Sequence, residues 1–317
     1  MKKLIIATRG SKLALWQSNH IKDVLEKAHD GLEVELKIFK TKGDKILDTP
    51  LALIGGKGLF TKELEEAMLR GEAHISVNSL KDMPFLIPEG LKLSAITERE
   101  DVRDSILSEK FENLNSLPDG AKIGTTSLRR SMQLLALRPD LKIAQLRGNV
   151  DSRIEKLKNG EFDAIVLASA GINRLELNDS VKYIYNVPVS DMIPSMGQGA
   201  LGIETTLDDE VLKIVEVLNE ETSEIETRIE RDFVGRLEGS CTVPIGVNAT
   251  LLINGTVITK AILGTPDGKE LLRDTNIGKK ENFREIGKTL AEKMIGAGAL
   301  EVLERATEIV EKSELTK

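Results

Sequence analysis

Strand and helix patterns alternate along roughly the first 200 residues, and this alternation limits the possible folds more than any other property of the chain. Short apolar stretches such as KLIIAT and FDAIVLASAG are typical of buried strands. Helical segments lie between them, and one is expected from Lys12, after the N-cap Ser11, to about Ala28. Strands that alternate with helices form parallel sheets of the doubly wound type. The sequence therefore predicts an α/β protein.

The length of the chain indicates more than one domain, because 317 residues exceed the usual size of a single core. We expect residues 1–100 to form a first α/β domain and residues 101–196 a second. By analogy with such folds, the segment from about 197 to 218 returns to the first domain. Residues 219–317 predict a small α+β domain, since strands joined by the turn dipeptides NG and DG lie there between helices.

Composition argues against several classes of protein. The net charge of −7 disfavours a broad nucleic-acid surface. A single cysteine excludes an internal disulfide, and the three histidines lack the spacing of metal ligands. The first apolar run is too short for a signal peptide, and no run approaches the roughly 18 apolar residues of a membrane span. We expect a cytoplasmic protein that binds no metal, nucleic acid or membrane.

Arginines recur where the predicted strands give way to helices. These arginines are Arg9, Arg129, Arg130, Arg147, Arg153 and Arg174. In doubly wound folds, ligands bind at the carboxyl ends of strands, where helix N-termini add N–H donors, and hydroxyls at Ser11, Thr126 and Ser127 add more. A single arginine is most often merely solvated. Six at successive strand ends of an acidic protein indicate a cleft for a ligand with several carboxylates or phosphates.

Three other segments leave their chemistry open. Asp82, beside Lys81 in NSLKDMP, could act as a general acid or base, could stabilise a charge, or could hydrogen-bond its own turn. Cys241, in LEGSCTVPIG, could be a small buried hydrophobe, a nucleophile or an attachment point. GGKGLFTKEL, which contains Lys57, lacks the spacing of a phosphate-binding loop and favours either a flexible lid or the start of a helix.

The motifs, taken together, resemble the porphobilinogen deaminase (hydroxymethylbilane synthase) family over essentially the whole chain. In order they are TRGSKLALWQ, GGKGLFTKELE, NSLKDMP, GTTSLRR, LRGNVDSR, DAIVLASAGINRL, MGQGALGIE and ERDFVGRLEGSCTVPIG. The resemblance implies a transferase that joins four porphobilinogen units head to tail into hydroxymethylbilane and releases ammonia each time, in tetrapyrrole (haem) biosynthesis. It also implies a monomer with two domains like periplasmic binding proteins and a third, small domain.

The resemblance implies a role for each candidate residue. A dipyrromethane cofactor is attached to Cys241 by a thioether and primes the chain. Asp82 is the catalytic residue and stabilises the positive charge that develops on a pyrrole nitrogen. Further cofactor contacts are implied for Asp82, Lys81, Thr126, Ser127, Arg129 and Arg130. Contacts to porphobilinogen and the growing polypyrrole are implied for Arg9, Ser11, Lys57, Phe60, Arg147, Arg153 and Arg174.

Asn78 departs from the family pattern, which usually has histidine at this position. Asparagine can hydrogen-bond but does not titrate near neutrality. A proton-transfer role of that histidine would therefore be absent here, whereas a role in holding the loop would be kept. We expect an active enzyme. The alternative interpretation is a non-enzymatic anion-binding protein with the same two-domain fold.

Overall fold

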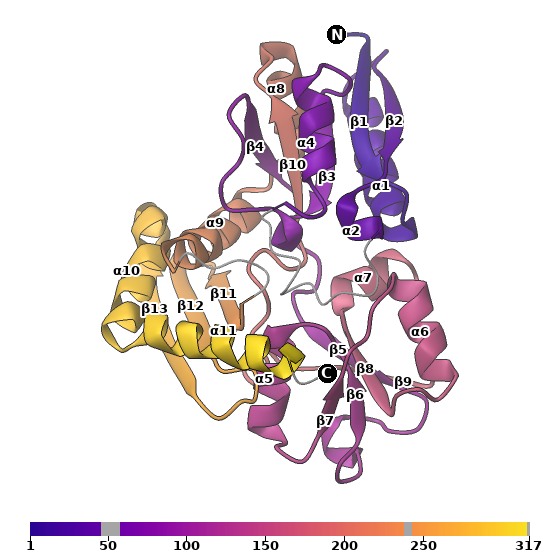
Figure 1. Ribbon diagram of the computed structural model, residues 1–317. Helices are drawn as coiled ribbons and strands as arrows, with labels where there is room; N and C mark the ends of the chain where they lie inside the picture. The colour runs from indigo at the N-terminus through magenta and orange to yellow at the C-terminus, as the bar shows by residue number, and fades with distance from the viewer. Residues whose placement is uncertain (46–57, 238–242, 316–317) are drawn as a thin grey trace. The chain divides into compact units, whose positions relative to one another are not determined.

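The computed structural model describes residues 1–45, 58–237 and 243–315, and these residues divide into two compact units (Figure 1). Unit 1 contains the described residues up to Glu100 together with Gly199–Glu224. Unit 2 contains Asp101–Gln198 and the described residues from Ile225 onward. Within the described part of the chain, no helix combines the length and the hydropathy needed to cross a membrane.

Unit 1 is built on a five-stranded sheet of order β2-β1-β3-β10-β4. β1 pairs in parallel with β2 and β3, whereas β10 lies antiparallel between β3 and β4. The strands are β1 (Lys3–Arg9), β2 (Glu33–Phe39), β3 (Ile75–Ser79), β4 (Leu91–Ile96) and β10 (Leu201–Thr206). The pairing of β10 confirms that the segment MGQGALGIET returns to the first sheet. It also makes the sheet mixed, where strand–helix alternation predicted parallel strands.

Helix α1 (Lys12–Ala28) begins where the sequence predicts. Its N-cap is Ser11, whose Oγ accepts a hydrogen bond from the Ala14 amide at 3.3 Å. α1 packs on β1, β2 and β3 and buries apolar side chains, among them Ile21 and Leu25, against the sheet (Figure 1). The other helical elements of unit 1 are α2 (Lys42–Lys45), α4 (Lys62–Leu69), the 3₁₀ turn η1 (Leu80–Asp82), α8 (Asp209–Val215) and η3 (Glu216–Leu218).

Unit 2 contains a second five-stranded sheet, of order β7-β6-β8-β5-β9. β6 is parallel to β7 and β8, and β5 is antiparallel to β8 and β9. The strands are β5 (Asp104–Ser108), β6 (Lys122–Gly124), β7 (Lys142–Ala144), β8 (Ala164–Ala168) and β9 (Tyr183–Asn186). The sequence analysis missed β5 and β9. Both are short, and the polar residues of β5 are buried, which hides the apolar pattern of a strand.

Three antiparallel strands, two helices and most of a third helix, from Ile225 onward, complete unit 2. The strands are β11 (Ile245–Leu251), β12 (Thr256–Gly264) and β13 (Leu271–Lys279), and the helices are α9 (Glu221–Arg236), α10 (Phe283–Gly296) and α11 (Ala299–Leu315). The predicted NG and DG turns join the strands, with Gly255 and Gly268 at φ 75° and 72°. The helices of the second sheet are η2 (Leu114–Ser116), α5 (Leu128–Leu137), α6 (Val150–Lys158) and α7 (Ser169–Arg174).

The turn between β12 and β13 lies directly against α5. A Cβ atom on Gly268 would be only 2.6 Å from the backbone nitrogen of Ala136. Met132 of α5, Ile193 and Ile262 of β12 form a small shared core nearby. The division of unit 2 into two domains, near residues 197–219, stays a prediction.

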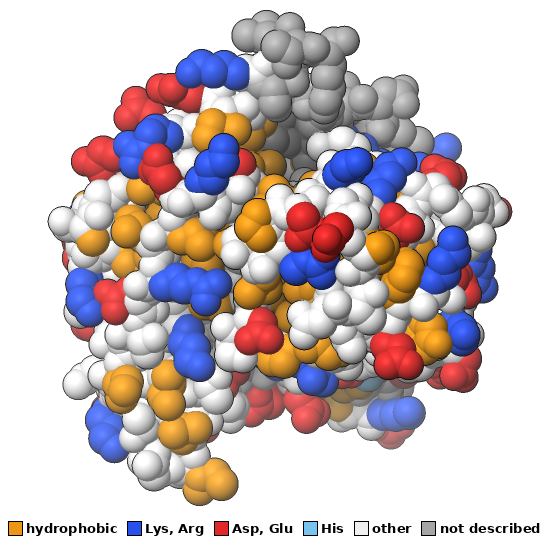
Figure 2. All heavy atoms as spheres, turned by 90° about the horizontal axis from the view of Figure 1, so that it is seen from below, with side chains coloured by type: hydrophobic (Ala, Val, Ile, Leu, Met, Phe, Trp, Pro, Cys, Tyr) orange, Lys and Arg blue, Asp and Glu red, His pale blue; other side chains and the backbone are white. Residues whose placement is uncertain are grey.

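Acidic and basic side chains are interspersed on the face of the protein that Figure 2 shows. The described residues of that face present no large patch of a single charge sign. This distribution agrees with an acidic chain whose basic residues are dispersed. The absence of nucleic-acid binding stays a prediction.

Candidate active site

Two groups of candidate residues in unit 1 lie at the same edge of its sheet. Arg9 is the last residue of β1, and Lys81 and Asp82 belong to η1, directly after β3. Because β1 and β3 are parallel neighbours, their carboxyl ends meet at one edge. Helix α1 supports this edge, since Gln17 Nε2 donates a hydrogen bond to Ser79 Oγ at 3.0 Å.

The guanidinium group of Arg9 is held on one edge and on one face. Its Nε donates to Asp44 Oδ1 at 3.1 Å, its Nη2 contacts the same carboxylate, and the Phe60 ring lies 4.3 Å from its Cζ. Asp44 also accepts hydrogen bonds from the amide and the hydroxyl of Thr41, at 3.1 and 2.8 Å. Among the described residues, nothing accepts a hydrogen bond from Arg9 Nη1. The described residues therefore leave the N–H groups of this nitrogen unused.

The carboxylate of Asp44 is kept ionised by these contacts. Partial burial by itself raises the pKa of Asp44, but the hydrogen bonds and the charge of Arg9, together with the hydrogen bonds from Thr41, lower it below its usual value. Gly43 makes room for this arrangement, because a Cβ atom there would overlap the Phe60 ring at 2.1 Å.

Asp82 is exposed at the end of a short turn. The turn is fixed by backbone hydrogen bonds, from Met83 to Leu80 at 3.2 Å and from Leu80 to Ala200 at 3.0 Å. Among the described residues, no donor reaches the Asp82 carboxylate, so the hydrogen bond to its own turn that the sequence left open is not found there. The carboxylate is available to accept hydrogen bonds from a ligand.

Asn78 hydrogen-bonds to a serine of its own strand, and that serine links the strand to its neighbour. Its Nδ2 donates to Ser76 Oγ at 2.9 Å, and Ser76 Oγ donates to Glu204 Oε2 at 3.2 Å. Ser76 and Asn78 lie in β3, and Glu204 lies in the neighbouring strand β10. All three side chains are buried. The amide of Asn78 therefore helps to hold the strand from which the Asp82 turn emerges.

The candidate residues of unit 2 also gather at one edge of a sheet. β6, β7 and β8 are parallel, so the segments after them lie at the same edge. These segments contain Thr126, Ser127, Arg129 and Arg130 after β6, Arg147 and Arg153 after β7, and Arg174 after β8. Asp104, the first residue of β5, pairs with Ala168 at the end of β8 and so lies at this edge as well.

Asp104 binds both adjacent arginines. Arg129 Nη1 donates to its Oδ2 at 2.7 Å, and Arg130 donates to its Oδ1 through Nε at 3.0 Å and through Nη2 at 2.7 Å. All three side chains are buried, and that of Asp104 is 0% exposed. Burial by itself raises the pKa of Asp104, but the two guanidinium charges and their hydrogen bonds hold it well below its usual range.

The remaining candidates of unit 2 have local partners or positions at helix ends. Ser127 is the N-cap of α5 and accepts a hydrogen bond from the Arg130 amide at 3.4 Å. Thr126 precedes it and is half-buried. Arg153 Nε donates to the carbonyl of Gly148 at 2.8 Å. Arg147 is half-buried after β7, and Arg174 is buried at the end of α7.

Sequence reasoning missed the two aspartates that hold the candidate arginines. Asp44 lies 35 residues after Arg9, and Asp104 lies 25 and 26 residues before Arg129 and Arg130. No fixed spacing links an acid to an arginine over such distances. The one available signal was Asp104 itself, an acid directly before the short segment SILS.

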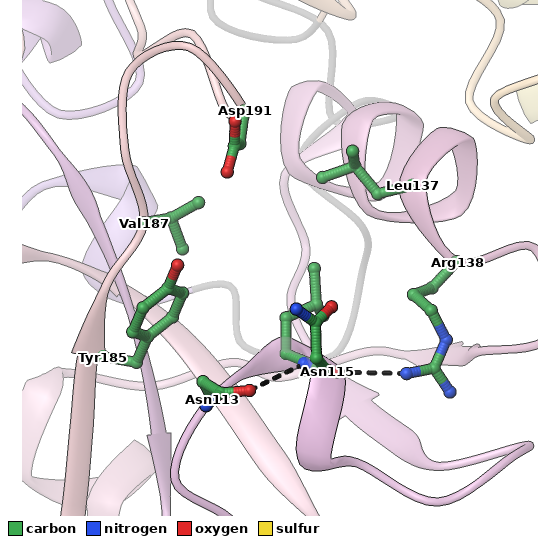
Figure 3. A pocket seen from close by; sticks show the side chains of 8 residues that line it. Asn113, Asn115, Leu137, Arg138, Tyr185, Val187 and Asp191 are labelled. Carbon is green, nitrogen blue, oxygen red and sulfur yellow. Dashed lines mark hydrogen bonds between the residues drawn. The ribbon is translucent and has the colours of Figure 1, made fainter.

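Cys241 and Lys57 lie outside the described residues. A small hollow of about 120 Å³ lies in unit 2 and contains none of the predicted site residues. Figure 3 shows Tyr185 and Val187 on one side of it and Leu137 and Arg138 on the other. Arg138 is already paired with Asp140 at 2.8 Å. The full lining is Asn113, Leu114, Asn115, Leu137, Arg138, Tyr185, Val187 and Asp191.

Two family models match the sequence. "Porphobilinogen deaminase, dipyromethane cofactor binding domain" matches residues 4–214, and "Porphobilinogen deaminase, C-terminal domain" matches residues 225–296. A porphobilinogen deaminase of a Nitratiruptor species is 66% identical over 304 residues, 96% of this chain and 97% of that relative. One of Sulfurimonas denitrificans is 60% identical over 311 residues, 98% of this chain and 99% of the relative.

Among solved structures, a TRAP periplasmic solute binding protein from Desulfovibrio salexigens aligns with 70% of this chain and 73% of its own, at a TM-score of 0.42 and 15% identity. The BvgS periplasmic VFT2 domain of Bordetella pertussis aligns with 68% of this chain and 86% of its own, at a TM-score of 0.40 and 15% identity.

Proposed function

The chain belongs to the porphobilinogen deaminase family, and on that premise we propose which of its residues bind the cofactor, bind the substrate and take part in catalysis. As a member of this family it is a transferase of tetrapyrrole biosynthesis that uses a dipyrromethane cofactor and joins four porphobilinogen units into hydroxymethylbilane. The observation that carries the assignment of roles is the contrast between the two sheet edges. The edge in unit 1 presents an exposed acceptor, Asp82. The edge in unit 2 presents the pair Arg129 and Arg130, some of whose N–H donors are not used by the described residues.

The residues present fit a dipyrromethane. Such a group carries carboxylate side chains and pyrrole N–H groups, so it needs cationic donors for the first and an anionic acceptor for the second. We assign the donors to Arg129, Arg130, Ser127, Thr126 and Lys81, the acceptor to Asp82, and the thioether to Cys241. When bound, the dipyrromethane supplies the pyrrole carbon to which the first substrate unit is joined.

Asp82 is the catalytic residue in this proposal. Its carboxylate accepts hydrogen bonds from pyrrole N–H groups and stabilises the positive charge that develops on the pyrrole nitrogen as the amine departs. Its exposure and the absence of a donor among the described residues support this role, because the carboxylate does not need to leave a protein partner first. The turn that holds it is anchored by the Leu80 amide to the carbonyl of Ala200, directly before β10.

Recognition of porphobilinogen falls to the remaining arginines. Each pyrrole unit has an acetate and a propionate side chain, and the planar fork of arginine binds carboxylates through paired hydrogen bonds. We assign this role to Arg9, Arg147, Arg153 and Arg174, with Ser11, Lys57 and Phe60. The position of Phe60 on one face of Arg9 supports its part, because the ring limits how that guanidinium group can turn.

Intact-protein mass spectrometry tests the assignment of the attachment site. The wild-type chain is expected to be heavier than its sequence mass by one dipyrromethane, and Cys241→Ser is expected to lack the addition and to form no bilane. Ser240→Ala, a change beside the thiol, is the matched control and keeps the addition. An unmodified wild-type protein that folds, binds porphobilinogen and does not turn it over would favour the alternative, a non-enzymatic anion-binding protein.

We further propose that the enzyme is a cytoplasmic monomer that binds no nucleic acid. The net charge of −7 supports the absence of nucleic-acid binding, because such binding needs a basic patch or stripe. Light scattering during gel filtration tests whether the enzyme is a monomer, and a mass near twice 34.8 kDa would contradict this proposal.

A further inference from the structure

Arg129 and Arg130 share a single buried carboxylate, and this sharing determines what the pair can offer to a ligand. Two guanidinium groups bring two positive charges, and Asp104 neutralises one of them. Among the described residues, no second acid forms an ion pair with either arginine. One net positive charge is therefore left in a buried place, where charges interact strongly.

The hydrogen bonds already made also define which donors remain. Arg129 Nη1 uses both of its N–H groups, on Asp104 and on the carbonyl of Ile193 at 2.9 Å. Arg130 uses one N–H of each nitrogen, two on Asp104 and one on the carbonyl of Val166 at 2.9 Å. Since each guanidinium group has five N–H groups, Arg129 keeps Nε and Nη2 for a ligand, and Arg130 keeps one N–H on each Nη.

Asp104 is in turn held in place by the surrounding residues. Gln198 Nε2 donates to its Oδ1 at 3.1 Å and to the carbonyl of Val102 at 2.8 Å. Gln133 binds both backbone groups of Ile193, accepting from the amide at 2.7 Å and donating to the carbonyl at 2.9 Å. The carboxylate and the carbonyl that orient Arg129 are thus both fixed.

The two arginines would not hold this arrangement without the acid. Burial and the neighbouring charge of Arg130 both lower the pKa of Arg129, against the opposing attraction of Asp104. Side by side in a buried place, two guanidinium groups without a carboxylate repel each other and lose their fixed orientation.

We propose that Asp104 is a positioning residue for ligand binding: it fixes the forks of Arg129 and Arg130 and reduces their combined charge to one, so that their remaining N–H groups receive the carboxylates of the dipyrromethane. The inference rests on the proposed function. Asp104 touches no ligand itself and acts through the arginines.

The test is Asp104→Asn, which keeps the shape of the side chain and removes its charge. The fraction of purified chains that carry the dipyrromethane mass is expected to fall at least about threefold, because two unbalanced and mobile guanidinium groups no longer match the ligand. Leu134→Ala is the matched control. It lies on the same helix and weakens the apolar core without contacting Asp104, and it is expected to keep wild-type loading.

A second measurement separates positioning from a purely structural role. In Asp104→Asn the pair carries two net charges, so sodium sulfate is expected to raise its melting temperature more than sodium chloride of equal ionic strength does. Because sulfate stabilises folded proteins in general more than chloride does, the comparison is between variants. The gain in melting temperature from sulfate over chloride is expected to be larger in Asp104→Asn than in the wild type, and equal in the wild type and Leu134→Ala. Wild-type loading in Asp104→Asn, or an equal loss in Leu134→Ala, would overturn the proposal.

Gln198→Leu provides the same test if Asp104→Asn fails to fold. It removes one hydrogen bond from the carboxylate and is expected to lower the loaded fraction by a smaller factor, and unchanged loading would again overturn the proposal. A wild-type chain without any dipyrromethane mass contradicts the proposed function instead, whatever the variants do.

Discussion

At the residue scale, the candidate arginines and the candidate catalytic acid differ in whether protein groups already bind them before any ligand does. Arg9, Arg129 and Arg130 are each bound by an internal aspartate, whereas Asp82 has no donor among the described residues. A charged side chain that is already oriented loses little conformational entropy when it binds. The arginines are therefore built for recognition, and Asp82 is left to respond to charge that appears during the reaction.

Substitution of Asp82 separates chemistry from folding. Asp82→Asn is expected to lower kcat about 100-fold or more, because removing one group that stabilises a transition-state charge usually has an effect of this size. The melting temperature of the unloaded protein is expected to stay unchanged, because no described residue depends on the carboxylate. Glu89→Gln, an exposed acid in the following loop, is the control and should change neither quantity. A kcat within a few fold of wild type would remove Asp82 from the catalytic role.

The contact between Asp44 and Arg9 predicts a pH dependence of stability. Folding lowers the pKa of Asp44, so the ionised carboxylate stabilises the folded state. This stabilisation is complete above the unfolded pKa of about 3.9 and is lost as the pH falls through the lower folded pKa. Asp44→Asn is expected to reduce the free energy of unfolding by about 0.5–1 kcal/mol at pH 7, with a difference that shrinks towards zero below pH 4. Urea unfolding from pH 3 to pH 7 measures it.

The control for that experiment is Asp30→Asn, an exposed aspartate with no partner among the described residues. Its effect on the free energy of unfolding should be close to zero across the same pH range. A difference between wild type and Asp44→Asn that does not vary with pH would contradict the ion pair.

At the element scale, the contact between the β12–β13 turn and α5 links the C-terminal strands to the helix that carries Arg129 and Arg130. Gly268 and Gly160 both have positive φ, at 72° and 78°, but only Gly268 approaches another backbone. Gly160→Ala is expected to cost about 1–2 kcal/mol from backbone strain alone. Gly268→Ala is expected to cost about 1–3 kcal/mol more, because its Cβ would press against Ala136.

Equilibrium unfolding of the two alanine variants measures this difference. If the turn supports α5, Gly268→Ala should also lower the dipyrromethane-loaded fraction, while Gly160→Ala should leave it unchanged. Equal unfolding free energies in the two variants would show that the turn can move away from α5 at no cost.

At the scale of the whole molecule, attachment of the dipyrromethane should stabilise the folded chain. A group that binds only the folded state raises its stability, and here it would also balance the net charge left on the arginine pair. The loaded protein is expected to melt several degrees above unloaded protein, as measured by scanning calorimetry. Unloaded wild type, made in a host without porphobilinogen, and Cys241→Ser should melt alike. Adding porphobilinogen should raise the melting temperature of the unloaded wild type and leave that of Cys241→Ser unchanged.

Much of the architecture follows from local pattern. The periods of two and 3.6 residues separate strands from helices within short windows, so α1, β1, β2 and the hairpins of the C-terminal strands could be predicted. β5 and β9 could not, because buried polar side chains and a length of four or five residues leave no period to detect. The arginines could be placed at strand ends, since that placement depends only on where each strand stops.

By itself, the sequence determined the α/β class, the arginine positions and, through its motifs, the family. Only the tertiary structure decided which charges meet. Asp104 reaches Arg129 and Arg130 because β5 runs antiparallel beside β8, which brings the start of one strand to the edge where the other ends. Strand direction and neighbour order are set by packing between segments far apart in the chain. Ion-pair partners that meet through such packing have no fixed spacing in the sequence, so they could not be predicted from it.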